Sequence, residues 1–298
     1  MPSAKQKLFA MSCILTVALV WGLMWYPLRY LKMQGISAPA ASLCIYVLCM
    51  VWGGLLFWRE YRQNFRPSWS LFVLLLVYGW TNFSYAWALT EGPVMRVLLL
   101  VYLSPLWTAL LAAGLLKEHL TRTGMAVIPL SLLGCVIILY RPDMWERGGL
   151  LTQTYEWIAL SSGMAFAVGC VLARRASHVA VSIRSACLWI GVASCSFLFL
   201  LQQGSLGQVL QLSWVGVLVI VALSVSLMAT SLLSVHALTI LPVSQVMSLM
   251  LVELVFAALA SYWLAGETLS TQEWIGAVLI VGASLLSGHM TVPNRGSS

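Results

Sequence analysis

Charged side chains are scarce in this chain of 298 residues. Asp, Glu, Lys and Arg make up 8% of it, against roughly 25% in ordinary soluble domains. Hydrophobic residues reach 61%, and the mean hydropathy is +0.92. A soluble domain of this composition would need an apolar core far larger than its surface. Membrane-crossing helices of about 20 apolar residues account for the excess directly. The composition therefore predicts an integral membrane protein.

The chain also lacks the common motifs of nucleotide and metal chemistry. It has no HExxH, GxxxxGK[ST] or GxGxxG sequence and no metal-spaced cluster of His and Cys, so zinc chemistry and ATP-driven transport lose support. Its seven cysteines form no CxxC pair and fall inside apolar runs, which indicates small packing side chains rather than disulfides. We therefore expect no cofactor, no metal and no enzymatic activity.

Apolar runs separated by Gly, Pro, Ser or charged clusters give ten segments that we expect to be transmembrane helices. They cover residues 8–30, 37–58, 69–90, 93–116, 121–140, 155–176, 181–201, 213–239, 242–265 and 272–289. The net charge of +7 does not point to nucleic acid, because the basic residues are scattered through short loops and form no continuous patch.

The basic residues instead predict the orientation in the membrane. If the N-terminus is inside, eleven of them lie on the cytoplasmic side: Lys5, Lys7, Arg59, Arg62, Arg66, Lys117, Arg122, Arg174, Arg175, Arg184 and Arg295. The other five lie outside: Arg29, Lys32, Arg96, Arg141 and Arg147. Because cytoplasmic loops carry the excess of Lys and Arg, we expect a bacterial inner-membrane protein with both termini in the cytoplasm.

The chain matches itself at half its length. The pattern Ala-Leu-Thr-x-x-Pro-Val-x-x-Val begins at Ala88 and again at Ala237, 149 positions later. This indicates a duplication, and we expect two repeats, residues 1–146 and 147–298. Five spans per repeat is an odd number, so the second repeat should insert upside down relative to the first. Inverted repeats around a central site suit a transporter that opens alternately to either side.

Several short motifs carry a resemblance to a known family: Trp21-Gly22, Ser104-Pro105-Leu106, Leu116-Lys117-Glu118 and Ala265-Gly266-Glu267. With them the chain resembles the EamA-type ten-helix branch of the drug/metabolite transporter superfamily. The resemblance implies two inverted five-helix bundles with a solute cavity between helices 1, 3, 4, 6, 8 and 9. Where the family usually has Pro in span 9, this chain has Leu254. Span 9 therefore lacks the proline kink that Pro105 predicts for span 4.

Glu253 is the strongest candidate for a functional residue. It lies midway through an otherwise apolar span, where an ionised carboxylate costs several kcal/mol unless it is paired or protonated. We expect it to face the solute cavity as a proton carrier or as a counter-ion for a cationic solute. The alternative is a structural carboxyl group, protonated or hydrogen-bonded to a neighbouring helix.

Aromatic residues in three spans are candidates for a substrate pocket that suits aromatic, amphipathic or cationic solutes. With Glu253, the predicted substrate-binding residues are Trp21, Trp25, Tyr78, Asn82, Tyr85 and Tyr102. In span 3, Tyr78, Asn82 and Tyr85 share one helical stripe. The alternative for these side chains is ordinary packing, since aromatic residues are common in membrane proteins.

Charged residues near the outer face are candidates for a gate. Glu91 could pair with Arg29 or with Arg96. The alternative is that both arginines extend to the lipid headgroups. In the second repeat Gln245 stands where Arg96 stands in the first, and Glu253 stands where Ser104 does, so only the second repeat supplies the deep acid.

Our leading hypothesis is a secondary transporter, more specifically an exporter, of small organic solutes such as amino acids, amines or drug-like metabolites. One alternative is uptake or exchange of a quaternary amine through the aromatic pocket. Another is a membrane enzyme or lipid-handling protein, for which the loop Arg141–Tyr155 is the only place long enough for an active site. The expected partners are the transported solute and the lipid bilayer. Protons could drive the transport. The oligomeric state stays open.

Overall fold

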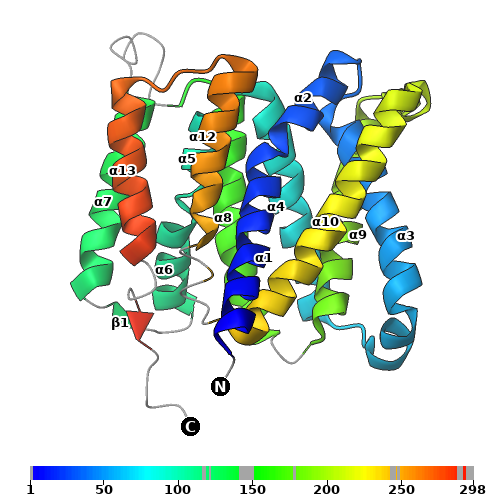
Figure 1. Cartoon of the computed structure of the whole chain (residues 1–298), viewed down its shortest axis with the longest axis horizontal. Coiled ribbons are helices and arrows are strands. Elements are labelled where there is room, and N and C mark those ends of the chain that lie inside the picture. Colours follow the sequence, from blue (N-terminus) through cyan, green and yellow to red (C-terminus); the bar gives the residue numbers. More distant parts are fainter. Residues whose placement is uncertain are drawn as a thin grey trace.

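The computed structural model describes residues 3–115, 119–120, 122–140, 151–176, 179–241, 246, 249–286 and 291–292. In these residues the chain is a bundle of helices that run side by side, with one pair of two-residue strands (Figure 1). We call the end of the bundle at which α1 begins the near end. The opposite end, where α2 lies, is the far end (Figure 1).

A helix lies in every apolar segment predicted from the sequence. The first half contains α1 (Ala4–Leu23), α2 (Trp25–Met33), α3 (Ala38–Asn64), α4 (Trp69–Glu91), α5 (Val94–Val101), α6 (Ser104–Leu115), β1 (His119–Leu120) and α7 (Arg122–Leu139). The second half contains α8 (Thr154–Arg175), α9 (Val181–Gln202), the 3₁₀ helix η1 (Leu206–Gln211), α10 (Trp214–Ile240), α12 (Val252–Ala265), α13 (Thr271–Leu286) and β2 (Thr291–Val292). β1 pairs antiparallel with β2 at the near end.

The length and composition of the helices confirm a multi-pass, all-helical membrane protein. Six segments among the described residues are long and apolar enough to cross a bilayer: Ala4–Met33, Ala38–Asn64, Trp69–Glu91, Thr154–Ala173, Val181–Gln202 and Trp214–Ser234. Shorter apolar helices lie at Val94–Thr108, Ile128–Leu139 and Val252–Ala265. Large apolar side chains are exposed on the bundle, among them Leu55, Leu198 and Val278, as expected for a surface that contacts lipid.

Serine side chains begin several of the helices. The Oγ atom of Ser37 accepts a hydrogen bond from the backbone N–H of Ala40, and that of Ser68 accepts one from Leu71. These caps satisfy N–H groups that have no partner inside the helix. Pro93, the proline of the repeated pattern, directly precedes α5, where the missing N–H of proline costs nothing. Its counterpart Pro242 lies outside the described residues.

Two of the predicted spans are interrupted near their middle. α5 ends at Val101 and α6 begins at Ser104, which agrees with the break that Pro105 predicts, since proline has no N–H to donate to the preceding turn. Span 9 is also interrupted, at Leu251, although no proline stands there. In its place the N–H of Leu254 bonds to the carbonyl of Leu251 at 3.1 Å, a tighter turn than that of an α-helix.

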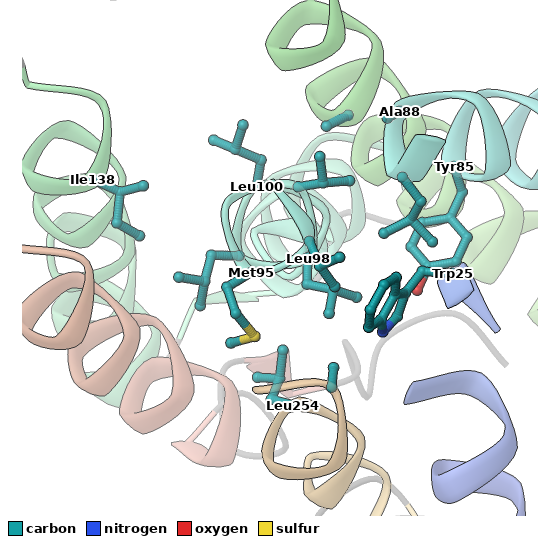
Figure 2. Packing of buried hydrophobic residues seen from close by; sticks show 14 of the residues in the cluster. Trp25, Tyr85, Ala88, Met95, Leu98, Leu100, Ile138 and Leu254 are labelled. Atoms are coloured by element: carbon teal, nitrogen blue, oxygen red, sulfur yellow. The ribbon is translucent and has the colours of Figure 1, made fainter. Parts of the chain in front are cut away.

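α5 lies at the centre of the main hydrophobic cluster. Its buried side chains include Met95, Leu98 and Leu100, and they point outward in several directions from the helix (Figure 2). Around them lie Ile138 of α7, Leu254 of α12 and Tyr85 of α4 (Figure 2). Apart from Arg96, every residue of α5 is apolar, and so apolar a helix is stable only when neighbours cover nearly all of it. The composition of α5 therefore explains its central place.

α4 and α9 cross so closely that glycine is required on both helices. A Cβ atom at Gly79 would lie 2.5 Å from the backbone carbon of Gly191, and one at Gly191 would lie 2.2 Å from the carbonyl oxygen of Leu75. Small residues at such crossings are typical of membrane helices, because they let the two backbones approach.

We therefore expect Gly79→Ala and Gly191→Ala each to lower the free energy of unfolding by about 1–3 kcal/mol, the usual cost of overpacking. Thermal unfolding of the purified protein in detergent measures this. Gly54→Ala is the matched control, because Gly54 lies in α3 with nothing within 4 Å of its missing Cβ. Equal stability of all three variants would contradict the crossing described here.

Candidate functional site

A buried carboxylate, Glu253, lies at the point where span 9 is interrupted. It stands in the first turn of α12 and its residue is 6% exposed. The hydroxyl of Tyr102 donates to Oε2 of Glu253 at 2.9 Å, and the hydroxyl of Tyr85 donates to Oε1 at 3.3 Å. The start of a helix also favours a negative charge. Both carboxylate oxygens are therefore hydrogen-bonded, and both donors come from the first half of the chain.

The two interruptions bring these groups together. Tyr102 lies in the turn between α5 and α6, and Glu253 follows directly on the turn at Leu251. Tyr102 and Leu251 stand 149 positions apart, which is the offset of the sequence repeat. The two halves therefore break their helices at matching positions, and only the second half supplies an acid there.

The Trp21-Gly22 motif fixes α1 against this point. A Cβ atom at Gly22 would lie 2.9 Å from the carbonyl oxygen of Glu253, so only glycine lets α1 approach so closely. Next to it, the ring of Trp21 lies 6.2 Å from that of Tyr85. Trp25 is 2% exposed and lies beside Tyr85 (Figure 2). Trp21, Trp25, Tyr85, Tyr102 and Glu253, all predicted from the sequence, thus form one cluster.

Tyr78 and Asn82 do not reach this cluster. Tyr78 packs instead against a separate hydrophobic cluster that contains Leu74 and Cys187. The amide nitrogen of Asn82 donates to the Tyr78 carbonyl of its own helix at 3.1 Å. Tyr78 and Tyr85 do lie on the same side of α4. They are seven residues apart, however, and seven residues of α-helix extend about 10 Å. Tyr78 is therefore two turns from Tyr85, too far to contact the same carboxylate.

A second polar cluster closes the far end of the bundle. Arg29 Nη1 pairs with Oε1 of Glu267 at 2.6 Å, and Arg29 Nε donates to the Leu89 carbonyl at 3.1 Å. A further Arg29 nitrogen, Nη2, donates to the carbonyl of Gly92. Oε2 of Glu267 accepts from the backbone N–H of Val94 at 2.8 Å. The guanidinium group thus links α2, the start of α5 and the α12–α13 connection.

Gly266 explains how Glu267 reaches this position. Its φ of 64° is in the left-handed region, where glycine ends helices without strain. The chain therefore turns after α12 and presents Glu267 to Arg29. The Ala265-Gly266-Glu267 motif is in this sense a device for placing a carboxylate. Glu118, its counterpart in the first half, lies outside the described residues.

The predicted gate pairs form differently from what we expected. Glu91 pairs with Lys32 at 2.8 Å, and Arg96 Nε lies 3.0 Å from Oε1 of Glu156. Glu91 is therefore not the partner of Arg29 or Arg96. Instead of extending to the headgroups, the Arg96 side chain is 11% exposed and its Glu156 partner 0%. The prediction paired residues that are close in the sequence, whereas the acids that pair with Arg29 and Arg96 both come from the second half of the chain.

Sequence reasoning missed Glu156 and the partner role of Glu267. Glu156 also accepts hydrogen bonds from the backbone N–H groups of Thr152 and Gln153. Glu156 lies in the first turn of α8, two residues after Thr154. An acid at this position often caps a helix start, and this signal could have identified Glu156 from the sequence. Other sequence predictions fall outside the described residues: Gln245, and residues 141–150 of the loop proposed for an enzyme. In the described part of the chain, no group of three His, Cys, Asp or Glu side chains is arranged to hold a metal.

The two ion pairs should differ in their effect on stability. Replacing Glu156 with Gln leaves the Arg96 charge buried without a partner, which typically costs about 3–5 kcal/mol. Glu91→Gln is the control: its pair with Lys32 is 41–42% exposed, and such pairs contribute about 0–1 kcal/mol. Thermal unfolding measures both, and similar losses in the two variants would show that the burial of Arg96 and Glu156 carries no energetic weight.

Comparison with known proteins identifies the family. The sequence profile of the EamA-like transporter family matches residues 8–140 and, a second time, residues 153–288. A Pseudomonas aeruginosa protein named as an uncharacterized transporter is 28% identical over 164 residues, 51% of this chain and 50% of the relative, so the match spans about half of that protein. One known crystal structure shares the fold, with a TM-score of 0.57 and 19% identity, covering 96% of this chain and 98% of the other. The chain belongs to the EamA-like transporter family, as a multi-pass membrane protein.

Proposed function

We propose that this protein is a secondary transporter that exports small organic solutes, such as amino acids, amines or drug-like metabolites, by alternating access. The observation that carries the proposal is the buried Glu253 carboxylate with its two tyrosine donors. Such a group in the middle of a membrane protein is typical of ion and substrate pathways. It also lies between interrupted helices from both halves, the usual place of transporter sites.

The packing of the helices supports two inverted five-helix repeats, residues 1–146 and 147–298, with ten spans in all. α4 packs on α8, and their repeat equivalents α10 and α1 also pack together. In the same way, the contact of α4 with α9 corresponds to that of α10 with α3. The contact of α6 with α8 corresponds to that of α12 with α1. α3 packs on its own equivalent α9, and α7 on α13. A pseudo-two-fold axis in the membrane plane would produce this pattern.

Glycines allow a close contact between the halves at each interruption, although the repeat does not match their positions, since Gly22 corresponds to Val171. Gly22 of α1 packs against the Glu253 carbonyl where span 9 breaks. In α8, the repeat equivalent of the α1 segment, a Cβ at Gly163 would lie 2.9 Å from the Val101 carbonyl, where span 4 breaks. Each interrupted helix is thus held by a glycine in the first helix of the other half. Such contacts between rigid bundles allow one half to rock against the other.

The two polar clusters suggest the steps of the alternating-access transport cycle. With both termini in the cytoplasm, the far end faces outward, and the Arg29–Glu267 pair closes the outer side. A proton or a cationic solute that reaches Glu253 competes with Tyr85 and Tyr102 for the carboxylate. Loss of these bonds would free α12 from the first half. Arg29 would then exchange its protein partners for water as the outer side opens.

The test of this proposal is transport by Glu253→Gln. We expect the variant to retain its fold, because the Gln carbonyl oxygen still accepts from one tyrosine and its NH2 group can donate to the hydroxyl oxygen of the other. We expect it to lose the dependence of solute flux on an imposed pH gradient. Flux is measured in proteoliposomes at several gradients, with solutes first selected by a thermal-shift screen, since a bound solute stabilises the native state.

Glu273→Gln is the matched control. Glu273 is a carboxylate at the start of α13 that bonds to Ser270, away from the tyrosines, and Gln can replace it in that capping role. Unchanged pH-dependent flux in Glu253→Gln would remove Glu253 from the coupling role.

A second candidate function, uptake or exchange of a cationic metabolite, rests on the rings beside the acid. The rings of Trp21 and Tyr85 lie 6.2 Å apart, tilted by 53°, near Glu253. The guanidinium of Arg29 already lies 5.0 Å from the Trp25 ring centre. The cluster can therefore hold a cation on an aromatic face. In the same flux assay, inward transport of a quaternary amine that needs Glu253 would favour this function over export.

A further inference from the structure

The near end of the bundle contains a cavity that is separate from the Glu253 cluster. It has a volume of about 490 Å³ and lies between α3, α9 and α10. These three helices neighbour one another on the opposite side of the molecule from α7 and α13 (Figure 1). The residues that line the cavity are Phe57, Glu60, Ala180, Val181, Ser182, Ser185, Trp189, Met228, Ser231, Leu232 and His236. The volume is in the range of small-molecule sites.

The cavity is polar at its mouth and apolar at its floor. Glu60 lies near the end of α3, Ser182 in the first turn of α9 and His236 near the end of α10, so all three are at the near end. Trp189 follows Ser182 by seven residues, which places it about 10 Å deeper along α9. Met228 lies equally far inside α10. The cavity therefore matches an amphiphile with its polar head at the membrane surface.

Two polar groups at the mouth lack partners among the described residues. Glu60 has no ion-pair partner among the residues that the structure describes. Ser182 is 7% exposed, and within the same ranges its hydroxyl has no hydrogen-bond partner. A buried hydroxyl without a partner costs free energy. A bound group that bonds to both the carboxylate and the hydroxyl would remove this cost.

The wall of the cavity offers a rigid aromatic face. Trp189 is 3% exposed and fills the space above Gly53, where a Cβ atom would lie 2.1 Å from the indole ring. The indole is therefore held in place by α3. Phe57 adds a second ring on the same helix as Glu60. Phe57 stands one helical turn from Glu60, and a carboxylate beside an aromatic ring is the combination that binds organic ammonium groups.

We propose that this cavity is a binding site for an amphiphilic ammonium compound that enters from the leaflet at the near end. The ammonium group pairs with Glu60 and donates to the Ser182 hydroxyl, while the apolar body lies on Trp189 and Met228. An anionic head would meet the unpaired Glu60 charge and is disfavoured. The ammonium group can belong to a free amine or to the headgroup of an amino lipid. The site shares no lining residue with the Glu253 cluster.

The test is binding of radiolabelled 2-(2-naphthyl)ethylamine to the full-length protein in nanodiscs of phosphatidylglycerol, which carries no amine. We expect saturable binding that Glu60→Gln weakens at least tenfold. Ser182→Ala and Trp189→Ala should weaken it less, and Trp189→Phe should restore part of the loss. Glu273→Gln, an interfacial carboxylate outside the cavity, is the matched control and should bind as the wild type does.

Repeating the measurement in phosphatidylethanolamine distinguishes the two sources of the amine. Weaker apparent binding there identifies the amino lipid as the occupant, and unchanged binding identifies the free amine. Equal affinity of wild type and Glu60→Gln would overturn the proposal, as would tighter binding of 2-naphthylacetate than of the amine. Thermal unfolding of each variant separates loss of binding from loss of fold.

Discussion

The acid at Glu253 is the constraint on which the rest of the structure depends. A carboxyl group inside a membrane protein must find partners within the protein, because lipid offers none. Here the partners are two tyrosine hydroxyls from the other half of the chain. Their reach requires that span 4 be interrupted at Tyr102 and span 9 just before Glu253. It also requires α1 to approach α12 at Gly22, where no side chain fits. The energetics of one polar group thus connect both halves.

The two ends of the bundle differ in a way that fits this centre. At the far end, Arg29 binds Glu267 and backbone carbonyls, and Arg96 binds Glu156. Each of these pairs joins the first half of the chain to the second. The near end has instead a cavity with an unpaired carboxylate among its described lining residues. In the proposed orientation, the protein is therefore closed to the outside by charge pairs and has its unfilled space on the cytoplasmic side.

The helices could be predicted from the sequence, but the pairing of their side chains could not. Each segment predicted from apolar runs and from the Gly, Pro and Ser residues between them contains a helix, because these patterns reflect local chemistry and the thickness of a bilayer. Glu253 stood out for the same reason. The partner of Arg29 could not be read in this way, because Glu267 is 238 positions away along the chain. Tyr78 lies apart from the Glu253 cluster, because a shared helical stripe gives direction but not depth. The break at Leu251 could not be predicted, because no proline stands there. Next to the break, span 9 packs against α1 at Gly22.

The most direct test of the central claim is infrared difference spectroscopy of Glu253 in the reconstituted protein. A change of pH or addition of a transported solute should change the carbonyl band of a protonated carboxyl group. Glu253→Gln should remove that band, and Tyr102→Phe should shift it, since the hydroxyl of Tyr102 bonds to this group. A band that persists in Glu253→Gln, or the absence of any carboxyl signal during solute binding, would contradict the role assigned to Glu253.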